Sequence, residues 1–403
     1  MKVAHVASYR PDAANGALSA AARLGAALID QGVEVEFWHL RRGIDRISER
    51  EEPSGVRVIE LPFPGVSRSR LGYVRWLPSR SRRWIEERAS AVSLLHFHSI
   101  FQPDAWFISS VIEKPYVTTP HGGYVRFQRD SWKRWARLPA WLAFERRFLE
   151  GAALVHAVSP HDADSVRELA PTATVVVIPN GVDLPEDPPA QVVAGSPWLY
   201  IGRLAVADKG LDVLIDGYAE ASNRAALPKL ILRGPDYRGG RSWLENRVAR
   251  HGVQARVEIG DAVFGDAKAE LLGGCSLFIH TSRTEGLPVA LLEAMAHSRP
   301  IAVTPGTNMV EPVSRSGAGV VISASTTEDV AAALLHASAL SPIALAASGD
   351  RGLALVKREY VWSAVAAQVV AAYRSLTHQP GSVGGRQDGP AKPPSRRWIW
   401  QTG

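Results

Sequence analysis

The stretch TSRTEGLPVALLEAMAHSRPIAVT, residues 281 to 304, has the most informative residue spacing in the chain. An apolar run, CSLFIH at residues 275 to 280, precedes it and predicts a short buried strand. Pro288 is expected to be the first residue of a helix, where its missing N–H costs nothing. Glu285 then lies in the loop before the helix, and Glu293 lies inside the helix.

The start of this helix has the chemistry of an anion site. The free amides of Gly286, Leu287 and Val289 point toward any group bound at the helix N-terminus. Of the two flanking carboxylates, one can accept hydrogen bonds from sugar hydroxyls and the other from ribose hydroxyls. Spacing alone fits a second reading equally well, in which one glutamate caps the helix and the other is solvated.

The pair Glu285 and Glu293, embedded in EGLPVALLEAMA, resembles the signature of the retaining GT-B glycosyltransferases of family 4. The resemblance extends over roughly residues 1 to 376. It implies an α/β fold of two Rossmann-like, doubly wound domains that face a central cleft. It also implies a hexosyltransferase in which Glu285 holds hydroxyls of the transferred sugar and Glu293 binds the nucleotide ribose. The amides of Gly286, Leu287 and Val289 would hold the donor diphosphate.

Length and composition are consistent with a two-domain enzyme. A chain of 403 residues is too long for one ordinary core, and 46% hydrophobic with 21% charged residues is a globular balance. A single cysteine excludes a disulfide framework and a thiolate metal cluster. Residues 1 to 8 read as a strand and not as a secretion signal, and no apolar run of about 20 residues predicts a membrane span. We therefore expect a cytoplasmic protein, and the net charge of +6 suggests an anionic partner.

The first half of the chain alternates strands and helices, which predicts a parallel sheet covered on both faces. Ligands bind beyond the carboxyl ends of the strands in such sheets. The predicted strands are residues 3–7, 33–40, 56–61, 94–98, 116–119, 154–158 and 175–178.

Five residues of the first half stand at predicted strand ends or in the loop after the first strand: Asn15, Gly16, His98, His121 and Asn180. His121 matches the family's strand-His-Gly segment, which implies that it lies near the donor sugar and bonds its hydroxyls. Gly16 stands where family members often have two glycines near the donor phosphate, and Asn15 departs from that pattern. Asn15, His98 and Asn180 are expected to line the acceptor or sugar cleft. The alternative for each histidine is a satisfied structural group.

His96 and His98 point the same way on their strand and could form half of a metal site. No carboxylate or cysteine stands nearby in the sequence, so no metal site is predicted.

The second half repeats the alternation and begins with a strand that ends in Gly202-Arg203-Leu204, followed by Asp208-Lys209-Gly210. Family members carry G-R-L and K-G here, which implies that Arg203 and Lys209 grip the donor diphosphate. Two fixed cations would stabilise the charge of the departing diphosphate. No Asp-x-Asp metal pattern is evident, so we expect a metal-independent enzyme without a cofactor, whose donor is a UDP- or GDP-linked sugar. Arg233, at a later strand end, is a further candidate for the acceptor or sugar cleft, where it could contact the base or the phosphate.

The predicted domains follow from these patterns and from the resemblance. Residues 1–184 form an acceptor-binding domain, and 185–196 form a proline-rich linker. Residues 197–359 form the nucleotide-sugar domain. An amphipathic helix over about 360–376 is expected to cross back onto the first domain. The Gly/Pro-rich tail, 378–403, is expected to be disordered.

Two stretches of the first half, residues 68–88 and 126–147, combine arginines with tryptophans. This composition favours peripheral contact with an anionic membrane, or a charged or lipid-diphosphate acceptor. The alternative is a solvated helix with its tryptophans packed inward. The charge also suits nucleic acid, but no nucleic-acid-binding signature appears, so we expect none.

The predicted function is retaining transfer of a sugar from a nucleotide sugar to a hydroxyl of a glycan, lipid-linked glycan or other glycoconjugate, as in polysaccharide biosynthesis. Other readings remain open: a nucleotide-sugar epimerase, a phosphorylase or another GT-B enzyme, or a non-catalytic membrane-surface protein. The last would leave the cluster of Arg203, Lys209, Glu285 and Glu293 without a role.

Overall fold

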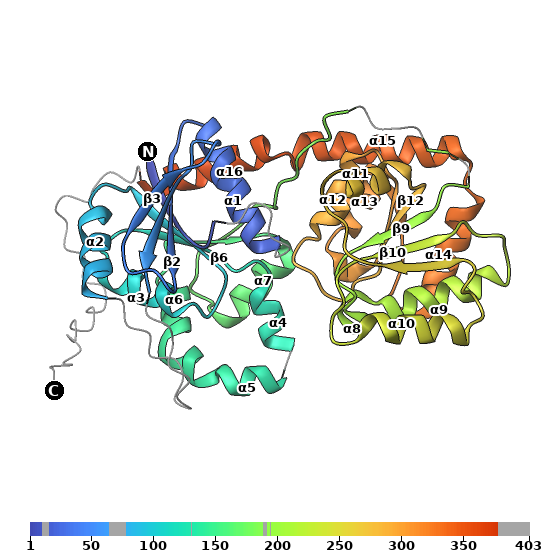
Figure 1. Ribbon diagram of the computed structural model, residues 1–403, viewed down its shortest axis with the longest axis horizontal. Coiled ribbons are helices and arrows are strands. Elements are labelled where there is room, and N and C mark those ends of the chain that lie inside the picture. Colours follow the sequence, from blue (N-terminus) through green and yellow to red (C-terminus); the bar gives the residue numbers. More distant parts are fainter. Residues whose placement is uncertain (10–15, 64–77, 130, 188–191, 194, 378–403) are drawn as a thin grey trace.

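Two separate sheets, each covered by helices, organise the chain in the computed structural model (Figure 1). The structure describes residues 1–9, 16–63, 78–129, 131–187, 192–193 and 195–377. The first sheet has eight strands in the order β3-β4-β2-β1-β5-β6-β7-β8, and the second has six in the order β11-β10-β9-β12-β13-β14. Neighbouring strands are parallel throughout, except that β3 runs antiparallel to β4. Both sheets are thus doubly wound, and the predicted GT-B fold class is confirmed.

The first sheet is built from short strands whose central members are buried on both faces. Its strands are β1 (Lys2–Val6), β2 (Glu34–Arg41), β3 (Ser48–Glu51), β4 (Arg57–Pro62), β5 (Leu94–His98), β6 (Tyr116–Thr119), β7 (Leu154–Ala157) and β8 (Val175–Val177). Its helices are α1 (Gly16–Asp30), α2 (Ser79–Ala89), α3 (Pro103–Val111), α4 (Gly123–Arg129), α5 (Ser131–Ala140), the π-helical turn η1 (Trp141–Glu145), α6 (Arg146–Glu150) and α7 (Pro160–Leu169).

The second sheet follows the same plan. Its strands are β9 (Trp198–Ile201), β10 (Leu230–Arg233), β11 (Val257–Gly260), β12 (Leu277–His280), β13 (Ile301–Val303) and β14 (Gly319–Val321). Its helices are α8 (Val206–Lys209), α9 (Leu211–Ser222), α10 (Gly240–Arg250), α11 (Gly265–Gly274), α12 (Val289–Ala296), the 3-10 turn η2 (Pro305–Thr307), α13 (Val310–Ser316), α14 (Thr327–Ala339) and α15 (Pro342–Glu359).

The last helix, α16 (Trp362–Thr377), leaves the second domain and packs against α1 of the first domain (Figure 1). Val365, Val369 and Tyr373 of this helix are buried in the core between α1 and the first sheet. Just before α16 begins, the Tyr360 carbonyl accepts a hydrogen bond from the Val182 amide at 2.8 Å. The polypeptide therefore passes between the two domains twice, near Val182 and near Tyr360, and the two passages lie side by side.

Several predicted boundaries differ from the structure by a few residues. Helix α12 begins at Val289 and not at Pro288, because the ψ of 107° at Pro288 is extended. The loop predicted before Lys209 contains the short helix α8, and the antiparallel edge strand β3 was not predicted. The linker prediction and the tail prediction, 378–403, fall partly or wholly outside the described residues.

Among the described helices, none alone has both the length and the apolar character of a membrane span. Two consecutive helices, α14 and α15, reach that level only when taken together, and they are bent by 111° at their junction.

Candidate active site

The loops that carry His121 and Glu285 meet where the two domains face each other. His121 and Gly122 follow strand β6 and both have left-handed φ values, 53° and 70°. A Cβ atom added to Gly122 would lie 3.2 Å from the Gly286 Cα, tighter than an ordinary contact. Glycine at position 122 therefore satisfies the turn and the close approach at once. The two candidate catalytic residues, from different domains, are brought to one place by this contact.

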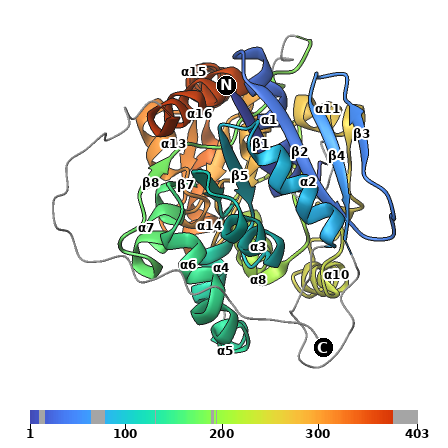
Figure 2. The same ribbon diagram turned by 90° about the vertical axis from the view of Figure 1, so that its left-hand side faces the viewer.

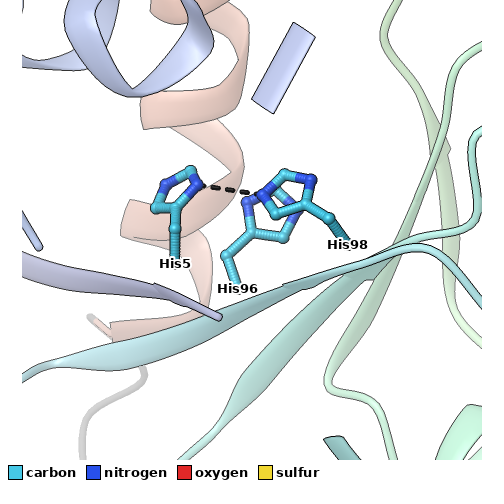
Figure 3. Close-up of side chains that lie close together, drawn as sticks. All are labelled: His5, His96 and His98. Atoms are coloured by element: carbon cyan, nitrogen blue, oxygen red, sulfur yellow. Dashed lines mark hydrogen bonds between the residues drawn. The ribbon is translucent and has the colours of Figure 1, made fainter. Parts of the chain in front are cut away.

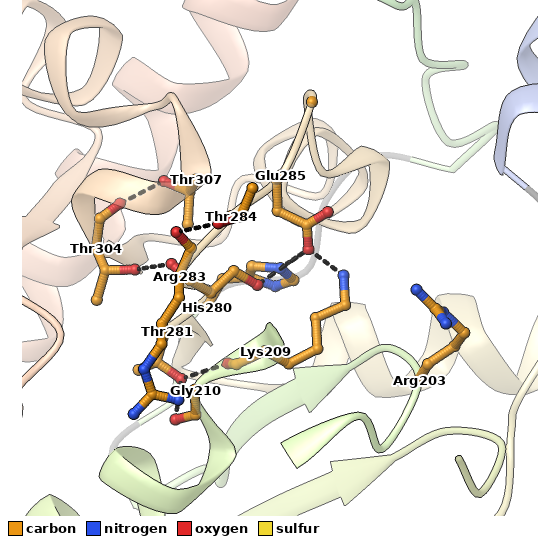
Figure 4. A network of polar contacts seen from close by, with 12 residues as sticks. Arg203, Lys209, Gly210, His280, Thr281, Arg283, Thr284, Glu285, Thr304 and Thr307 are labelled. Atoms are coloured by element: carbon orange, nitrogen blue, oxygen red, sulfur yellow. Dashed lines mark hydrogen bonds and ion pairs between the residues drawn. The ribbon is translucent and has the colours of Figure 1, made fainter. Parts of the chain in front are cut away.

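Glu285 is almost fully buried, with 7% of its surface exposed, and it is surrounded by donors (Figure 4). Its Oε1 forms an ion pair with Lys209 and accepts hydrogen bonds from Ser282 Oγ at 3.0 Å and His280 Nε2 at 3.4 Å. Burial alone would raise the pKa of Glu285, but the hydrogen bond from His280 and the charge of Lys209 outweigh it and hold the pKa well below its usual range. Glu285 is therefore an ionised acceptor throughout the neutral range.

The main chain around Glu285 is held by Asn308. Its Nδ2 donates to the Glu285 carbonyl at 2.7 Å and to the Gly286 carbonyl at 2.9 Å. Both carbonyls are thereby turned toward Asn308, into the second domain. No hydrogen bond from the amides of Gly286, Leu287 or Val289 is found within the described residues. These three amides can therefore bind an anion at the start of α12.

Lys209 is positioned by the turn that follows it. Gly210 has a φ of 61°, and a Cβ there would lie only 2.1 Å from the Thr281 carbonyl oxygen. Thr281 Oγ1 lies 3.0 Å from the Lys209 carbonyl and 2.9 Å from the Gly210 carbonyl. The Lys-Gly pair is thus pressed against the end of β12. This contact explains why glycine follows the lysine: it brings the ammonium to the loop of Glu285.

Arg203 lies on the same side of the Glu285 loop as the Lys209 ammonium (Figure 4). Its guanidinium is 5.0 Å from the centre of the Tyr237 ring, a cation–π contact. Within the described residues it forms no ion pair with a carboxylate. Arg203 can therefore give its charge and its donors to a bound diphosphate.

Glu293 lies farther along α12 and is paired with Lys268, whose Nζ is 2.7 and 2.6 Å from the two carboxylate oxygens. Arg233 is paired with Glu258, and Lys229 bonds to the same carboxylate at 2.5 Å. These two cations lower the pKa of Glu258 to about 2. Arg233 is thus engaged within its own sheet, and Glu293 would have to share its carboxylate between Lys268 and a ribose.

Sequence models of known families match both halves of the chain. The Glycosyltransferase Family 4 model matches residues 14–186, and the Glycosyl transferases group 1 model matches residues 197–339. The chain belongs to glycosyltransferase family 4. The prediction of a hexosyltransferase is likewise confirmed by these matches and by the relatives that follow.

Two related proteins are also named as glycosyltransferases. A GDP-mannose:cellobiosyl-diphosphopolyprenol alpha-mannosyltransferase of Xanthomonas oryzae pv. oryzae is 26% identical over 72% of this chain and 75% of its own length. The protein of the same name from Xanthomonas campestris is 25% identical over 69% of this chain and 70% of its own length.

Solved structures share the fold. Sucrose-phosphate synthase of Thermosynechococcus elongatus has a TM-score of 0.71 at 19% identity, covering 93% of this chain and 98% of that one. HepE of Anabaena, in complex with UDP and glucose, has a TM-score of 0.66 at 18% identity, covering 93% of this chain and 100% of that one.

In this glycosyltransferase the remaining candidates divide into three groups. His98 and Asn180 line one small cavity together with His121. Gly16 is exposed at the start of α1. Asn15 lies outside the described residues.

The sequence analysis did not identify three residues of this site: His280, Asn308 and Lys268. His280 was detectable, because it ends β12 directly before the loop of Glu285. Asn308 follows the turn η2 and contacts the main chain of Glu285, whereas Lys268 lies on α11 and pairs with Glu293. Both contacts depend on how the elements of the second domain pack together.

Proposed function

We propose that this glycosyltransferase moves a mannosyl group from GDP-mannose to a hydroxyl of a lipid-linked acceptor, with retention of configuration. The observation that carries the site assignment is the buried Lys209–Glu285 pair, with the Arg203 guanidinium nearby. The open amides of Gly286, Leu287 and Val289 lie next to it, where Gly286 approaches Gly122 of the His121 loop. The donor and acceptor are supported by the names of the two Xanthomonas relatives. A UDP-linked sugar is the second candidate, because HepE of the same fold was solved with UDP and glucose.

Charge accounts for the main roles. As the glycosidic bond breaks, negative charge grows on the leaving diphosphate, and donors fixed in advance stabilise it best. Arg203 and Lys209 would supply the compensating positive charge. They and the amides at the start of α12 would donate hydrogen bonds to the diphosphate. A bound diphosphate would compete with Glu285 for Lys209, which would free Glu285 Oε1 to accept hydrogen bonds from the sugar hydroxyls. These cations would take the role that a metal ion has in other transferases.

Retention is supported by the same arrangement. GDP-mannose is α-linked, and the Xanthomonas relatives are named alpha-mannosyltransferases, so the same anomeric configuration would appear in the product. Glu285 Oε1 also accepts hydrogen bonds from Ser282 and His280, which lower its nucleophilicity. Glu285 is therefore better suited to bind the sugar hydroxyls than to attack the sugar. The acceptor hydroxyl would then attack from the face that the diphosphate leaves.

Peripheral attachment to an anionic membrane is the proposal for the first domain. Trp135, Leu142 and Phe144, around the junction of α5 and η1, are 67%, 59% and 51% exposed. The exposed arginines Arg134 and Arg137 stand on the same helix. Figure 2 shows α5 at the margin of the domain, away from the sheet. Exposed apolar side chains beside cations suit a surface of anionic lipid, where a lipid-linked acceptor would be found.

The first arginine-rich stretch does not contribute in the same way where it is described. Trp84 of α2 packs edge-on against Trp38, with ring centres 5.5 Å apart, and Arg88 lies over its ring. This part matches the alternative of an inward tryptophan. Residues 68–77 of the stretch lie outside the described residues.

A donor panel tests the proposed reaction. Purified protein is mixed with a polyprenyl-diphosphate disaccharide and with GDP-mannose, GDP-fucose, UDP-glucose or UDP-galactose, and release of nucleoside diphosphate is measured with and without EDTA. We expect release with GDP-mannose, unchanged by EDTA, and an α-linked product by NMR. Release from UDP-sugars only would overturn the donor assignment, and loss of activity in EDTA would overturn metal independence.

Membrane attachment has its own prediction. Removing Trp135 and Leu142 together (Trp135→Ser, Leu142→Ser) should lower binding to phosphatidylglycerol vesicles about tenfold or more, because each apolar side chain contributes roughly 1.5–3 kcal/mol when buried. Vesicle flotation measures the bound fraction. Ile343→Ser is the matched control, since Ile343 is 82% exposed but lies on α15 of the second domain. Equal binding by the double variant and the control would contradict the proposal.

A further inference from the structure

Five histidines gather at the carboxyl end of the first sheet. They are His5 on β1, His96 and His98 on β5, His156 on β7, and His121 after β6. Burial lowers the pKa of His5 and His121 to about 3 and that of His156 to about 4. Burial and the neighbouring histidines hold the pKa of His96 and His98 well below the usual value. All five rings are therefore neutral near pH 7, and each carries one hydrogen on one of its two nitrogens.

A continuous series of hydrogen bonds joins these rings, and we call it the histidine chain. It begins at the Ile178 carbonyl, 2.8 Å from His156 Nε2, and passes from His156 Nδ1 to Thr119 Oγ1 at 3.0 Å. Thr119 Oγ1 lies 2.7 Å from His96 Nε2, and His96 Nδ1 lies 2.5 Å from the Tyr373 hydroxyl. The histidine chain thus runs from His156 on β7 to Tyr373 on α16.

From Tyr373 the chain returns to the candidate active site. The Tyr373 hydroxyl is 3.5 Å from His5 Nε2, the longest link. His5 Nδ1 is 2.9 Å from His98 Nε2 (Figure 3). His98 Nδ1 is 3.2 Å from His121 Nε2. The chain ends there, because His121 Nδ1 is buried and has no hydrogen-bond partner.

The direction of every bond follows from the first acceptor. A carbonyl oxygen can only accept, so His156 carries its hydrogen on Nε2 and its Nδ1 must accept from Thr119. The Thr119 hydrogen is then used, so Thr119 Oγ1 accepts from His96 Nε2. His96 Nδ1 is left bare and accepts from the Tyr373 hydroxyl. Each group has one hydrogen to give, so each bond sets the next.

The same reasoning carries past Tyr373. Its hydroxyl hydrogen is engaged with His96, so its oxygen accepts from His5 Nε2. His5 Nδ1 then accepts from His98 Nε2, and His98 Nδ1 accepts from His121 Nε2. His121 is left with a bare lone pair on Nδ1. The next residue, Gly122, is the one that contacts Gly286.

We propose that the histidine chain fixes the tautomer of His121, so that its Nδ1 accepts a hydrogen bond from a hydroxyl of the bound sugar. Tyr373, His5 and His98 act as positioning residues, because they reach the sugar only through His121. The inference rests on the proposed function for the identity of the hydroxyl, while the tautomers follow from the hydrogen bonds alone. Helix α16 thereby sets the hydrogen-bonding character of His121, on the loop that contacts the second domain at Gly286.

A metal ion is the competing use of three of these rings. Ring nitrogens of His5, His96 and His98 all lie within 4.8 Å of one another (Figure 3). Each of their six nitrogens already has a hydrogen-bond partner in the histidine chain. A bound ion would have to break those bonds, so the two uses exclude each other.

The tautomers can be read directly by long-range ¹H–¹⁵N NMR of protein labelled at histidine, with signals assigned from single His→Gln variants. We expect all five rings to carry the hydrogen on Nε2 only. A signal from hydrogen on Nδ1 of His121, or of any ring in the chain, would overturn the proposal. So would a shift of the His5, His96 and His98 signals on adding Zn²⁺ alone.

Tyr373→Phe removes the one hydroxyl that joins the two halves of the chain. His156 and His96 should keep their tautomer, since they stay tied to the Ile178 carbonyl, whereas His5, His98 and His121 should exchange between tautomers. The value of kcat/KM should fall about twofold to fivefold, in proportion to the fraction of His121 left in the competent form. No change in the His121 signal would overturn the link through Tyr373.

Tyr116→Phe is the matched control. Its hydroxyl also makes one buried hydrogen bond in the first domain, 2.6 Å to the Phe148 carbonyl, but it is not part of the histidine chain. It should leave all five histidine signals and kcat/KM unchanged. Because the NMR measurement needs no turnover, failure of the proposed reaction with every donor would leave the tautomer test intact.

Discussion

Replacing Lys209 with methionine should lower kcat/KM for sugar transfer by about a hundredfold to a thousandfold, the usual cost of removing one fixed donor from a developing anion. The ammonium is the cation that reaches Glu285, so no neighbouring side chain replaces it in the same position. Release of nucleoside diphosphate from the donor, followed at saturating acceptor, measures the loss. Lys229→Met is the matched control, because Lys229 is also paired with a glutamate of the second domain, at the surface.

Stability has to be separated from chemistry in this variant. The Lys209 and Glu285 side chains are only 12% and 8% exposed, so removing the lysine leaves a buried carboxylate without its cation. Breaking such a pair costs about 3–5 kcal/mol of unfolding free energy. Replacing both residues (Lys209→Met, Glu285→Gln) should recover most of that stability and remain inactive. A double variant that is both stable and active would contradict the assignment of the site.

Replacing Glu285 with glutamine should abolish transfer while leaving nucleoside-diphosphate binding intact or tighter. The amide keeps the shape of the side chain and still accepts from Ser282 and His280. It no longer holds Lys209 as an ion pair, so the ammonium is free for the diphosphate. We expect transfer to fall by about a hundredfold or more, as for loss of a group that orients the reacting sugar. Calorimetric titration with GDP separates binding from turnover.

This variant also has a signature in its pH dependence. Since the pKa of Glu285 is depressed in the folded protein, its contribution to unfolding free energy is present above the unfolded pKa of about 4.3 and is lost as pH falls. The glutamine variant should therefore lose stability less steeply in acid. Glu359→Gln, which removes a partner of Arg315 at the surface, is the activity control. Weaker GDP binding together with full transfer would contradict the role of Glu285.

Much of the architecture could be predicted from the sequence because it depends on local patterns. Strand and helix alternation predicts two parallel sheets, and parallel strands place their carboxyl ends on one edge. The family resemblance predicted that Arg203, Lys209 and the Glu285 loop share one site, and the structure brings these three together. Boundaries such as the start of α12 were off by one residue, because the ψ of Pro288 depends on the loop before it.

Other parts of the site could not be predicted because they depend on which side chains meet after folding. Lys268 and Glu293 are 25 residues apart and pair only because α11 packs beside α12. Arg233 looked free at a strand end, yet Glu258 on the neighbouring strand β11 engages it. A charged residue in a sequence does not show with which side chain it will pair after folding.

By itself the sequence determined the two-sheet fold, because strand and helix alternation follows from local periodicity. Its motifs indicated the family, and the resemblance to that family indicated the loops that carry the donor-site candidates. Only the tertiary structure decided that Gly122 touches Gly286 and that Tyr373 bonds to His96, 277 positions earlier in the chain. Only the assembled network also decides where the hydrogen of His121 lies. The physical reason is that a neutral imidazole has two possible hydrogen positions, and residue type cannot choose between them without a fixed acceptor at the other end of the chain.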